Sequence, residues 1–485
     1  MNAVVDKLSP SFAYSLWKNF AMISEVPRGS ANEQEIVQLL VDFADKYRLK
    51  WKKDATGNLV IYKEATEGKE RCPVVILQSH VDMVTEKTDQ SQHDFSIDPI
   101  EWVEDGEWIR ANGTTLGADD GIGVAATMAI LQSTDISHGA IEALFTVEEE
   151  TSMAGAMGVD SNLLRGRRLI NIDSEDSDVL TVGCAGGINL DIYKTYSSES
   201  LPESYQSFEI TLSGLKGGHS GCDIHLQRGN AIFVLARVLR ELQTVGIRIA
   251  NFKGGTVDNA IPRSAKASIA VPLEQVETFK KNVEQIIGDI KTELRSVDPT
   301  LNIKLIECDP LGSVIGEQEQ SNWLKAMHGC LNGVLRVSDD FELVVETSSN
   351  LGVFSIDDGV IRGVCFVRSL IDSATRNAGE AIAGHFELAG AQVERRGFFP
   401  GWKPEPKSEL LDLMHEQYKK LNQKEPKVEV IHAALECGII GSALGGADMV
   451  SIGPDIMNPH SPDERVNVDS VDKFYRLLVS TLENS

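Results

Sequence analysis

The sequence has 485 residues, enough for two or three domains that each bury a core of their own. Hydrophobic residues make up 42% and charged residues 24%, which is typical of globular chains and argues against extensive disorder. The formal net charge of −26 argues against a nucleic acid or an anionic membrane surface as a partner.

The seven cysteines are scattered and form no CxxC pair, which is typical of reduced thiols in an intracellular protein. Residues 1–20 carry Asp6 and Lys7 where a signal peptide would be apolar. No apolar run approaches the ~18 residues that a membrane-spanning helix needs. We therefore expect a cytoplasmic protein with no membrane partner.

Strand-like and helical patterns alternate through the first part of the chain. Residues 58–64, 73–80, 139–150 and 166–176 are apolar strand-like runs, and residues 121–132 form a helical pattern rich in small residues. This alternation predicts an α/β sandwich with a mainly parallel sheet, of the phosphorylase/hydrolase-like kind. In such sheets, catalytic groups gather at the carboxyl ends of the strands.

The pattern changes after residue 187. A strand, a helix, a strand and a helix follow between residues 207 and 294, and a similar order recurs from the strand at 302–309 to residue 389. Two such units predict an inserted α+β lid domain that is internally duplicated. The stretch 395–408, rich in Pro and Gly, is typical of a return linker. The predicted domains are a catalytic domain of residues 1–186 and 401–485 and a lid domain of residues 187–400.

Five segments place histidines or acidic residues at predicted strand ends. In the first, His80 and Asp82 are two residues apart, so on an extended strand they face the same way. A carboxylate that accepts one imidazole proton leaves the other ring nitrogen free for a metal ion. The other four segments contain the pair Asp119-Asp120, the triplet Glu148-Glu149-Glu150, Asp173, and His460 in a loop bounded by prolines.

Each of these segments also has a simpler structural explanation. Two acids at a helix start can cap the helix, and an acidic triplet can be a solvated loop. Together, two histidines and several carboxylates at strand ends of one domain match the ligand types of a site for two zinc ions. Magnesium prefers oxygen ligands, so the imidazoles favour Zn²⁺ or a similar transition metal such as Co²⁺ or Mn²⁺.

The motifs HVDMV, GADDG, FTVEEE, NIDSED and HSPDE, with GGHSG in the inserted part, resemble those of the M20 metallopeptidases in order and spacing over essentially the whole chain. TTLGADDGIG, NIDSEDSDVLTVGCAGG and HAALECG resemble the members of that family that cleave aminoacyl-histidine dipeptides. The resemblance implies a hydrolase of unblocked dipeptides, including Xaa-His and β-alanyl-histidine. It leaves open whether the chain acts as a monomer or as a homodimer.

The resemblance also implies roles for individual residues. It assigns His80 and Asp173 to one metal ion, Glu150 and His460 to the other, and Asp119 to both. It further implies a cis peptide bond after Asp119. Glu149 is then the general base, which takes a proton from the attacking water. On a regular strand Glu149 and Glu150 would point to opposite faces, so the chain must bend there for both to reach the site. Asp82 would orient His80.

In the inserted part, the resemblance makes His219 of GGHSG a donor to the developing oxyanion. The family pattern of an Asn before Ile-Pro and a later Arg is divided here, with Asn259 in the first unit and Arg368 in the second. We expect Asn259 to make a polar contact and Arg368 to bind the free C-terminus of a dipeptide, since a guanidinium forms two parallel hydrogen bonds with a carboxylate. The alternative is a surface arginine that ends an edge strand. A substrate imidazole would find polar neighbours near His432, Glu436 or the lid.

Three other functions stay open at this point. A tripeptide aminopeptidase or an N-acyl amino-acid amidohydrolase of the same family would use the same chemistry on a different substrate. A non-catalytic acidic binding protein would lack a base or a metal ligand, and none is missing. A magnesium phosphohydrolase would need a phosphate-binding glycine loop with a lysine, and it would leave His80 and His460 unexplained.

Overall fold

The computed structural model describes residues 3–405 and 407–485, and the chain divides into two compact units. The first unit consists of Met1–Gly183, Trp402–Val430 and Leu435–Ser485, and the second of Cys184–Gly401 and Ile431–Ala434. The short segment Ile431–Ala434 belongs to the second unit although the chain on both sides of it belongs to the first. The sequence patterns give no indication of this excursion.

An eight-stranded mixed sheet organises the first unit, in the order β1-β2-β6-β3-β7-β23-β8-β22. The four central strands are parallel, and the strands that flank them, β2 and β8, are antiparallel to β6 and β23 respectively. Every residue of β3 and β6 is buried, as expected for strands covered on both faces. The predicted α/β class is confirmed, with parallel pairing confined to the centre of the sheet. The strands are β1 (Lys50–Lys53), β2 (Leu59–Lys63), β3 (Val75–His80), β6 (Ile141–Thr146), β7 (Arg168–Asn171), β8 (Val179–Cys184), β22 (Lys427–Ile431) and β23 (Asp448–Ser451).

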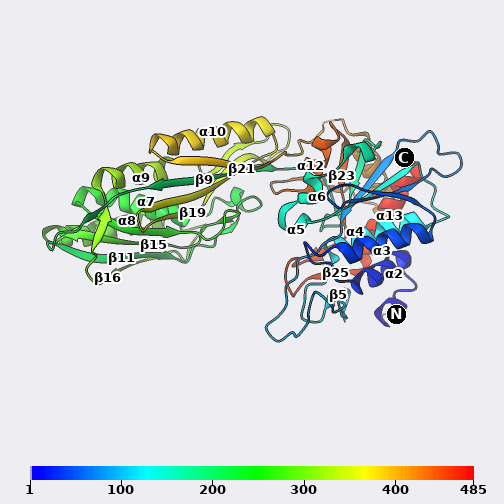
Figure 1. Cartoon of the computed structure of the whole chain (residues 1–485), viewed down its shortest axis with the longest axis horizontal. Helices are drawn as coiled ribbons and strands as arrows, with labels where there is room; N and C mark the ends of the chain where they lie inside the picture. Colours follow the sequence, from blue (N-terminus) through cyan, green and yellow to red (C-terminus); the bar gives the residue numbers. More distant parts are fainter. Residues whose placement is uncertain (1–2, 406) are drawn as a thin grey trace. The chain divides into compact units, whose positions relative to one another are not determined.

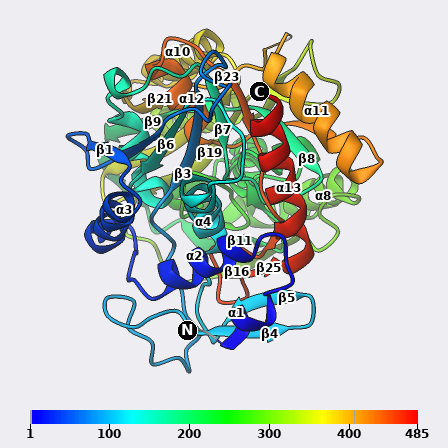
Figure 2. The same ribbon diagram turned by 90° about the vertical axis from the view of Figure 1, so that its right-hand side faces the viewer.

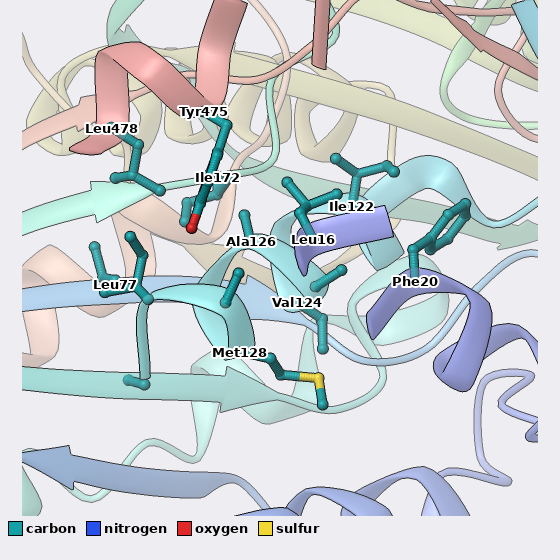
Figure 3. Close-up of a cluster of buried hydrophobic side chains, with 14 of the residues drawn as sticks. Leu16, Phe20, Leu77, Ile122, Val124, Ala126, Met128, Ile172, Tyr475 and Leu478 are labelled. Atoms are coloured by element: carbon teal, nitrogen blue, oxygen red, sulfur yellow. The ribbon is translucent and has the colours of Figure 1, made fainter. Parts of the chain in front are cut away.

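The core of the first unit forms around helix α4 (Ala118–Gln132), which is buried along almost its whole length. A helix that is apolar all round is expected only in the interior, and the small residues of α4 let its neighbours approach closely. Figure 3 shows side chains of α2 (Tyr14–Ser24), α4 and α13 (Val468–Asn484) in one cluster with Leu77 of β3. This cluster joins helices from both ends of the chain. The other helices of the unit are α1 (Ala3–Lys7), α3 (Gln34–Lys46), α5 (Glu149–Ser152), α6 (Ala154–Met157), α11 (Glu409–Asn422) and α12 (Glu436–Ala443).

A small antiparallel sheet in the order β24-β25-β5-β4 completes the first unit. Figure 2 shows β4, β5 and β25 beside α1 at the lower edge of the view. The connection between β24 and β25 carries His460, so this sheet fixes both ends of the loop in which that residue lies. The strands are β4 (Trp102–Asp105), β5 (Trp108–Ala111), β24 (Ile456–Met457) and β25 (Arg465–Asn467).

The second unit is built on a nine-stranded antiparallel sheet in the order β16-β11-β15-β13-β19-β20-β9-β21, with β18 paired to β19. Four helices lie along one face of this sheet (Figure 1), and their apolar sides share a core with alternate residues of the strands, such as Phe208, Ile210 and Leu212 of β11. The helices are α7 (Ala231–Leu242), α8 (Val276–Leu294), α9 (Glu317–Gly329) and α10 (Asp372–Leu388). The strands are β9 (Gly186–Thr195), β11 (Tyr205–Ser213), β13 (Arg248–Gly254), β15 (Ala265–Pro272), β16 (Asn302–Glu307), β18 (Gly333–Val337), β19 (Val345–Asp357), β20 (Val360–Ser369) and β21 (Gln392–Phe399).

Two short ribbons accompany the large sheet of the second unit. One pairs β12 (Gly218–His219) with β14 (Ala260–Ile261), and the other pairs β10 (Ser198–Ser200) with β17 (Ser313–Ile315).

The duplication expected in the second unit is not confirmed in its predicted form. The strand predicted at 302–309, expected to begin the second repeat, is β16, and it pairs with β11 at the edge of the sheet. The place beside β20 is taken by β9, which precedes both halves in the chain. A recurring order does exist when β14 and β18 are left aside. It is helix, strand, strand, helix, strand: α7-β13-β15-α8-β16 and α9-β19-β20-α10-β21. The predicted linker 395–408 is also wrong in part, because β21 extends to Phe399 and pairs with β9.

None of the helices in the described part of the chain combines the length and the apolarity needed to cross a membrane.

Candidate metal centre

Neighbouring strands of the parallel core end in the predicted site residues. His80 is the last residue of β3, and Asp173 follows the end of β7 by two positions. After β6, the chain passes through Glu148, whose φ of 52° turns it into the short helix α5, which begins with Glu149 and Glu150. The bend predicted at the acidic triplet is therefore present. Because β6, β3 and β7 are adjacent and parallel, all of these side chains lie at one edge of the sheet.

Asp119 lies between two imidazoles. Its Oδ1 is 3.0 Å from Nε2 of His80, and its Oδ2 is 3.3 Å from Nε2 of His460. Asp173 Oδ1 lies 3.4 Å from the same nitrogen of His80, and Glu150 Oε2 lies 2.9 Å from the same nitrogen of His460. The structure thus brings together the five residues predicted as ligands, in two groups that share Asp119.

The segment that delivers Asp119 turns sharply at Gly117, which has a φ of 67° and precedes α4. The peptide bond between Asp119 and Asp120 is cis, as the family resemblance implies. A Cβ at Gly117 would collide with the guanidinium of Arg28, and one at Gly121 would lie 2.6 Å from it. The two glycines of the GADDG motif therefore make room for a buried arginine behind the loop.

Asp82 connects His80 to the start of α5. Its Oδ1 is 3.4 Å from Nδ1 of His80, on the side of the ring away from Asp119. It also accepts the backbone N–H groups of Glu149 and Glu150 at 3.1 and 3.2 Å. Burial opposes ionisation of Asp82, but its hydrogen bonds, first among them that from His80, lower its pKa to about 2. The sequence predicts the contact with His80 and gives no indication of the contacts with the helix.

The carboxylates of this site carry more negative charge than their surroundings balance. Burial raises the pKa of Asp173 and of Glu149 well above the ordinary range, and neighbouring carboxylates add to the effect. Hydrogen bonds to Asp119 and Glu150 raise the pKa of His460 to about 11. In the part of the chain that the structure describes, the buried Oε1 of Glu150 has no hydrogen-bond partner. Crowded carboxylates, an unpartnered oxygen and two imidazoles form a donor set that fits divalent cations.

A chain of buried polar side chains lies one layer below these residues. Ser451 donates to Asn171, whose Nδ2 donates to Gln78 Oε1 at 2.6 Å. Gln78 Nε2 then donates to Glu436 Oε2 at 2.6 Å, and the hydroxyl of Thr146 donates to the same oxygen at 2.7 Å. Gln78 and Asn171 each precede a site residue of the same segment by two positions, so the chain ties together the ends of the strands that carry the site. The sequence patterns do not predict this network, whose signal in the sequence is a polar residue within an apolar run.

Glu436 itself begins α12 and is 0% exposed. Burial raises its pKa to about 7, and the side chain is fully enclosed beneath the site. This position does not favour the contact with a substrate imidazole that the sequence analysis considered.

A second polar cluster lies within the second unit. His219 Nδ1 accepts the backbone N–H groups of Gly221 and Cys222 at 3.2 and 3.0 Å. Burial, together with the charge of Arg368, lowers the pKa of His219 to about 4, so the ring is neutral at pH 7 and its proton is on Nε2. Arg368 Nη2 lies 3.3 Å from this Nε2. Two hydrogen-bond donors, the Nε2–H of His219 and Nη2 of Arg368, therefore face each other. Both can be satisfied only by an acceptor from outside the cluster.

Arg368 is an interior residue of the second unit. Its strand β20 lies between β19 and β9, and the side chain is 4% exposed, so the alternative of a surface arginine on an edge strand is wrong. Its guanidinium carbon is 4.2 Å from the centre of the Phe366 ring. Among residues 3–405 and 407–485, no carboxylate forms an ion pair with it, and its Nε has no hydrogen-bond partner. Burial lowers its pKa to about 10, which leaves it charged at neutral pH.

The remaining predicted residues of this unit lie around the same cluster. Asn259 is exposed, and Asn350 Nδ2 donates to the carbonyl oxygens on either side of it, at 3.1 and 2.8 Å. His432 Nε2 lies 2.7 Å from the hydroxyl of Ser348. Burial and the charge of Arg368 lower the pKa of His432 to about 3 and keep the ring neutral. Asn350, which fixes the backbone of Asn259, was not among the predicted site residues.

Comparison with known proteins agrees with this geometry. Residues 76–484 match the model of peptidase family M20/M25/M40. The chain is 39% identical over 480 residues to the cytosol non-specific dipeptidase of Escherichia coli (strain K12). The aligned region covers 99% of this chain and 98% of that protein. The crystal structure of aminoacylhistidine dipeptidase from Vibrio alginolyticus is 40% identical and has a TM-score of 0.92 over 98% of both chains. The aminopeptidase PepT of Bacillus cereus, at 16% identity and a TM-score of 0.57 over 98% of both chains, shares the fold.

Proposed function

This chain belongs to peptidase family M20/M25/M40, and we propose that it hydrolyses the peptide bond of unblocked dipeptides with the help of two divalent metal ions. The observation that carries the proposal is the position of Asp119, with one carboxylate oxygen towards His80 and the other towards His460. A carboxylate in this position can serve two ions at once. The proposed location is the cytosol, the compartment in the name of the Escherichia coli relative.

The proposed ligands are His80, Asp173 and Asp119 for one ion, and His460, Glu150 and Asp119 for the other. One imidazole and two carboxylates for each ion suit Zn²⁺, and Co²⁺ or Mn²⁺ can take the same donors. When bound, such ions act as Lewis acids on the peptide carbonyl and lower the pKa of water at the site.

Glu149 is the proposed general base. Its backbone is anchored to Asp82, and its side chain is free of the imidazoles that hold Asp119 and Glu150. Burial, aided by the charges of Asp173, Glu436 and Glu150, raises its pKa. A carboxylate in this position can take a proton from the attacking water and deliver it to the nitrogen of the leaving amine.

The donors of the second unit are proposed to bind the substrate. The Nε2–H of His219 can donate to the carbonyl oxygen as it becomes negative, because its Nδ1 is already occupied as an acceptor. Arg368 offers a buried guanidinium without a carboxylate in the described chain, which suits the free C-terminus of a dipeptide. Asn259 and His432 are proposed as further polar contacts, and a C-terminal histidine as a favoured residue of the substrate.

The proposal is tested by stripping the metal with a chelator and assaying the protein on unblocked dipeptides, tripeptides and N-acetylated amino acids. We expect activity to vanish on stripping, to return with zinc, cobalt or manganese, and to be highest on dipeptides, among them those that end in histidine. Full activity of the stripped protein would overturn the metal-dependent mechanism. Equal or faster cleavage of tripeptides would favour an aminopeptidase, and cleavage of acetylated amino acids alone would favour an amidohydrolase.

The roles within the acidic triplet are separable by three matched substitutions. Glu149→Gln should leave the metal content intact and lower kcat by at least ~10²-fold, since general-base catalysis contributes about that much. Glu150→Gln should lose metal because it removes a ligand. Glu148→Gln is the control, because that side chain accepts a hydrogen bond from Ser152 and has neither proposed role, so the substitution should change neither quantity. Loss of metal from Glu149→Gln with retention in Glu150→Gln would show that the two roles are exchanged.

The carboxylate clamp is tested with Arg368→Ala. Loss of a charged contact worth a few kcal/mol should lower kcat/KM for a free dipeptide by ~10²-fold or more, with the metal content unchanged. A C-terminally amidated dipeptide should lose much less from the same substitution, because it has no carboxylate to bind. Arg362→Ala, an exposed position on the same strand, is the control and should leave both substrates unaffected. Equal losses on both substrates with Arg368→Ala would exclude the clamp.

A further inference from the structure

Glu464 lies four residues after His460 and is 2% exposed. Its carboxylate accepts the backbone N–H groups of all four residues of the segment 116–119. The distances, in chain order, are 2.7 and 2.9 Å to Oε2 and 2.7 and 3.3 Å to Oε1. The last of these N–H groups belongs to Asp119, 345 residues away in the sequence. One buried side chain therefore holds the whole segment that carries Asp119 into the site.

Within the described part of the chain, the N–H groups of segment 116–119 have no other hydrogen-bond acceptor. They lie ahead of the first turn of α4 or within it, where backbone N–H groups lack partners inside the helix. The residue that would cap the helix is Gly117, which has no side chain. The role of a helix cap is thus filled by a carboxylate from the loop that also carries His460.

Arg28 holds the opposite side of the same segment. It is 3% exposed, and its Nη1 donates to the carbonyl oxygens of Val81 and Asp82 at 3.0 and 2.8 Å. Its Nη2 donates to the carbonyl oxygen of Gly117. The N–H of Gly117 is therefore bound by Glu464 and its C=O by Arg28. Arg28 also brings a positive charge to a region crowded with carboxylates, which offsets the cost of burying Glu464.

We propose that Glu464 and Arg28 act together as positioning residues, which set the place of Asp119 relative to His80 and His460 by clamping segment 116–119 from both sides. The inference rests on the proposed metal-binding role of Asp119. Glu464 links the loops of two proposed ligands, Asp119 and His460. Arg28 links the loop of Asp119 to that of Asp82. Both side chains thus connect loops that carry residues of the proposed metal site, and a residue that only stabilised the fold would have no need to do so.

The test uses Glu464→Gln, which keeps the size of the side chain. It turns one acceptor oxygen into a donor that faces backbone N–H groups. The matched control is Glu142→Gln. Glu142 is a fully buried carboxylate of β6 that accepts the backbone N–H groups of Arg165 and Gly166 at 2.8 and 3.0 Å, away from the site. Arg28→Lys is a second variant, since a single ammonium group cannot replace the guanidinium at all three carbonyl groups, which lie on two loops.

Three quantities are measured on each full-length variant: affinity for Zn²⁺ by chelator competition, hydrogen exchange of the 116–119 amides in the metal-free protein, and kcat with KM. We expect Glu464→Gln and Arg28→Lys to weaken Zn²⁺ affinity by about tenfold or more, the usual cost of removing a group that orients a ligand. Exchange of the 116–119 amides should accelerate, and kcat should fall with KM little changed. Glu142→Gln should change none of the three.

Two results would overturn the clamp: unchanged exchange of segment 116–119 in Glu464→Gln, or an equal loss of Zn²⁺ affinity in Glu142→Gln. If Glu464→Gln fails to fold, Arg28→Lys decides the question by the same measurements. Failure of the proposed function is a separate outcome, because it would show as a wild-type protein that binds no Zn²⁺, whereas the exchange measurement needs no metal.

Discussion

Carboxylates that lie close together and out of water repel one another, and this repulsion is the constraint around which the first unit is arranged. Asp119, Glu150 and Asp173 converge on two imidazoles, that of His80 at the end of β3 and that of His460 in the loop between β24 and β25. Burial and mutual repulsion raise the pKa of Asp173, which shows the cost of holding these charges without cations. Divalent ions would remove that cost, which is why a fold that keeps such a cluster is best explained as a metal-binding one.

The surroundings of the cluster hold the repelling groups in place. Asp82 fixes His80 on one side and the start of α5 on the other. The chain of side chains from Ser451 to Glu436 ties the strand ends together from below. Backbone N–H and amide groups make most of these contacts, so positions are fixed by hydrogen bonds and few further charges are added. The polar cluster of the second unit is positively charged instead. It consists of the charged guanidinium of Arg368 and neutral imidazoles, with more hydrogen-bond donors than acceptors.

The sequence predicts the parts of this arrangement that depend on local periodicity. The two-residue spacing of His80 and Asp82 predicts that both side chains face the same way, and they are in contact although Asp82 lies beyond the end of β3. Glu149 and Glu150 would point to opposite faces of a regular strand, which predicts a bend in the acidic triplet, and the structure has it at Glu148. Strand and helix positions follow from hydrophobic patterns for the same reason. The family motifs add the grouping of the ligands around Asp119, which spacing alone leaves open.

What the sequence does not predict depends on contacts between distant segments. The hydrophobic patterns of β9 and β16 do not depend on which strand each pairs with. The sequence therefore predicts the wrong order of elements for the expected duplication. Glu464 appears in the sequence as one more acidic residue near a histidine, and its four backbone partners lie near residue 117. Glu436 could not be recognised as buried because its burial depends on Gln78 and Thr146 from two other strands.

Anomalous diffraction from crystals of the zinc-loaded protein tests the bridging position of Asp119 most directly. Two zinc peaks are expected, about 3.5–4 Å apart as in other two-metal hydrolases. One should lie against His80 and Asp173, the other against His460 and Glu150, with the carboxylate of Asp119 between them. A single peak, or two peaks of which one does not contact Asp119, would contradict a shared carboxylate and with it the proposed two-metal site.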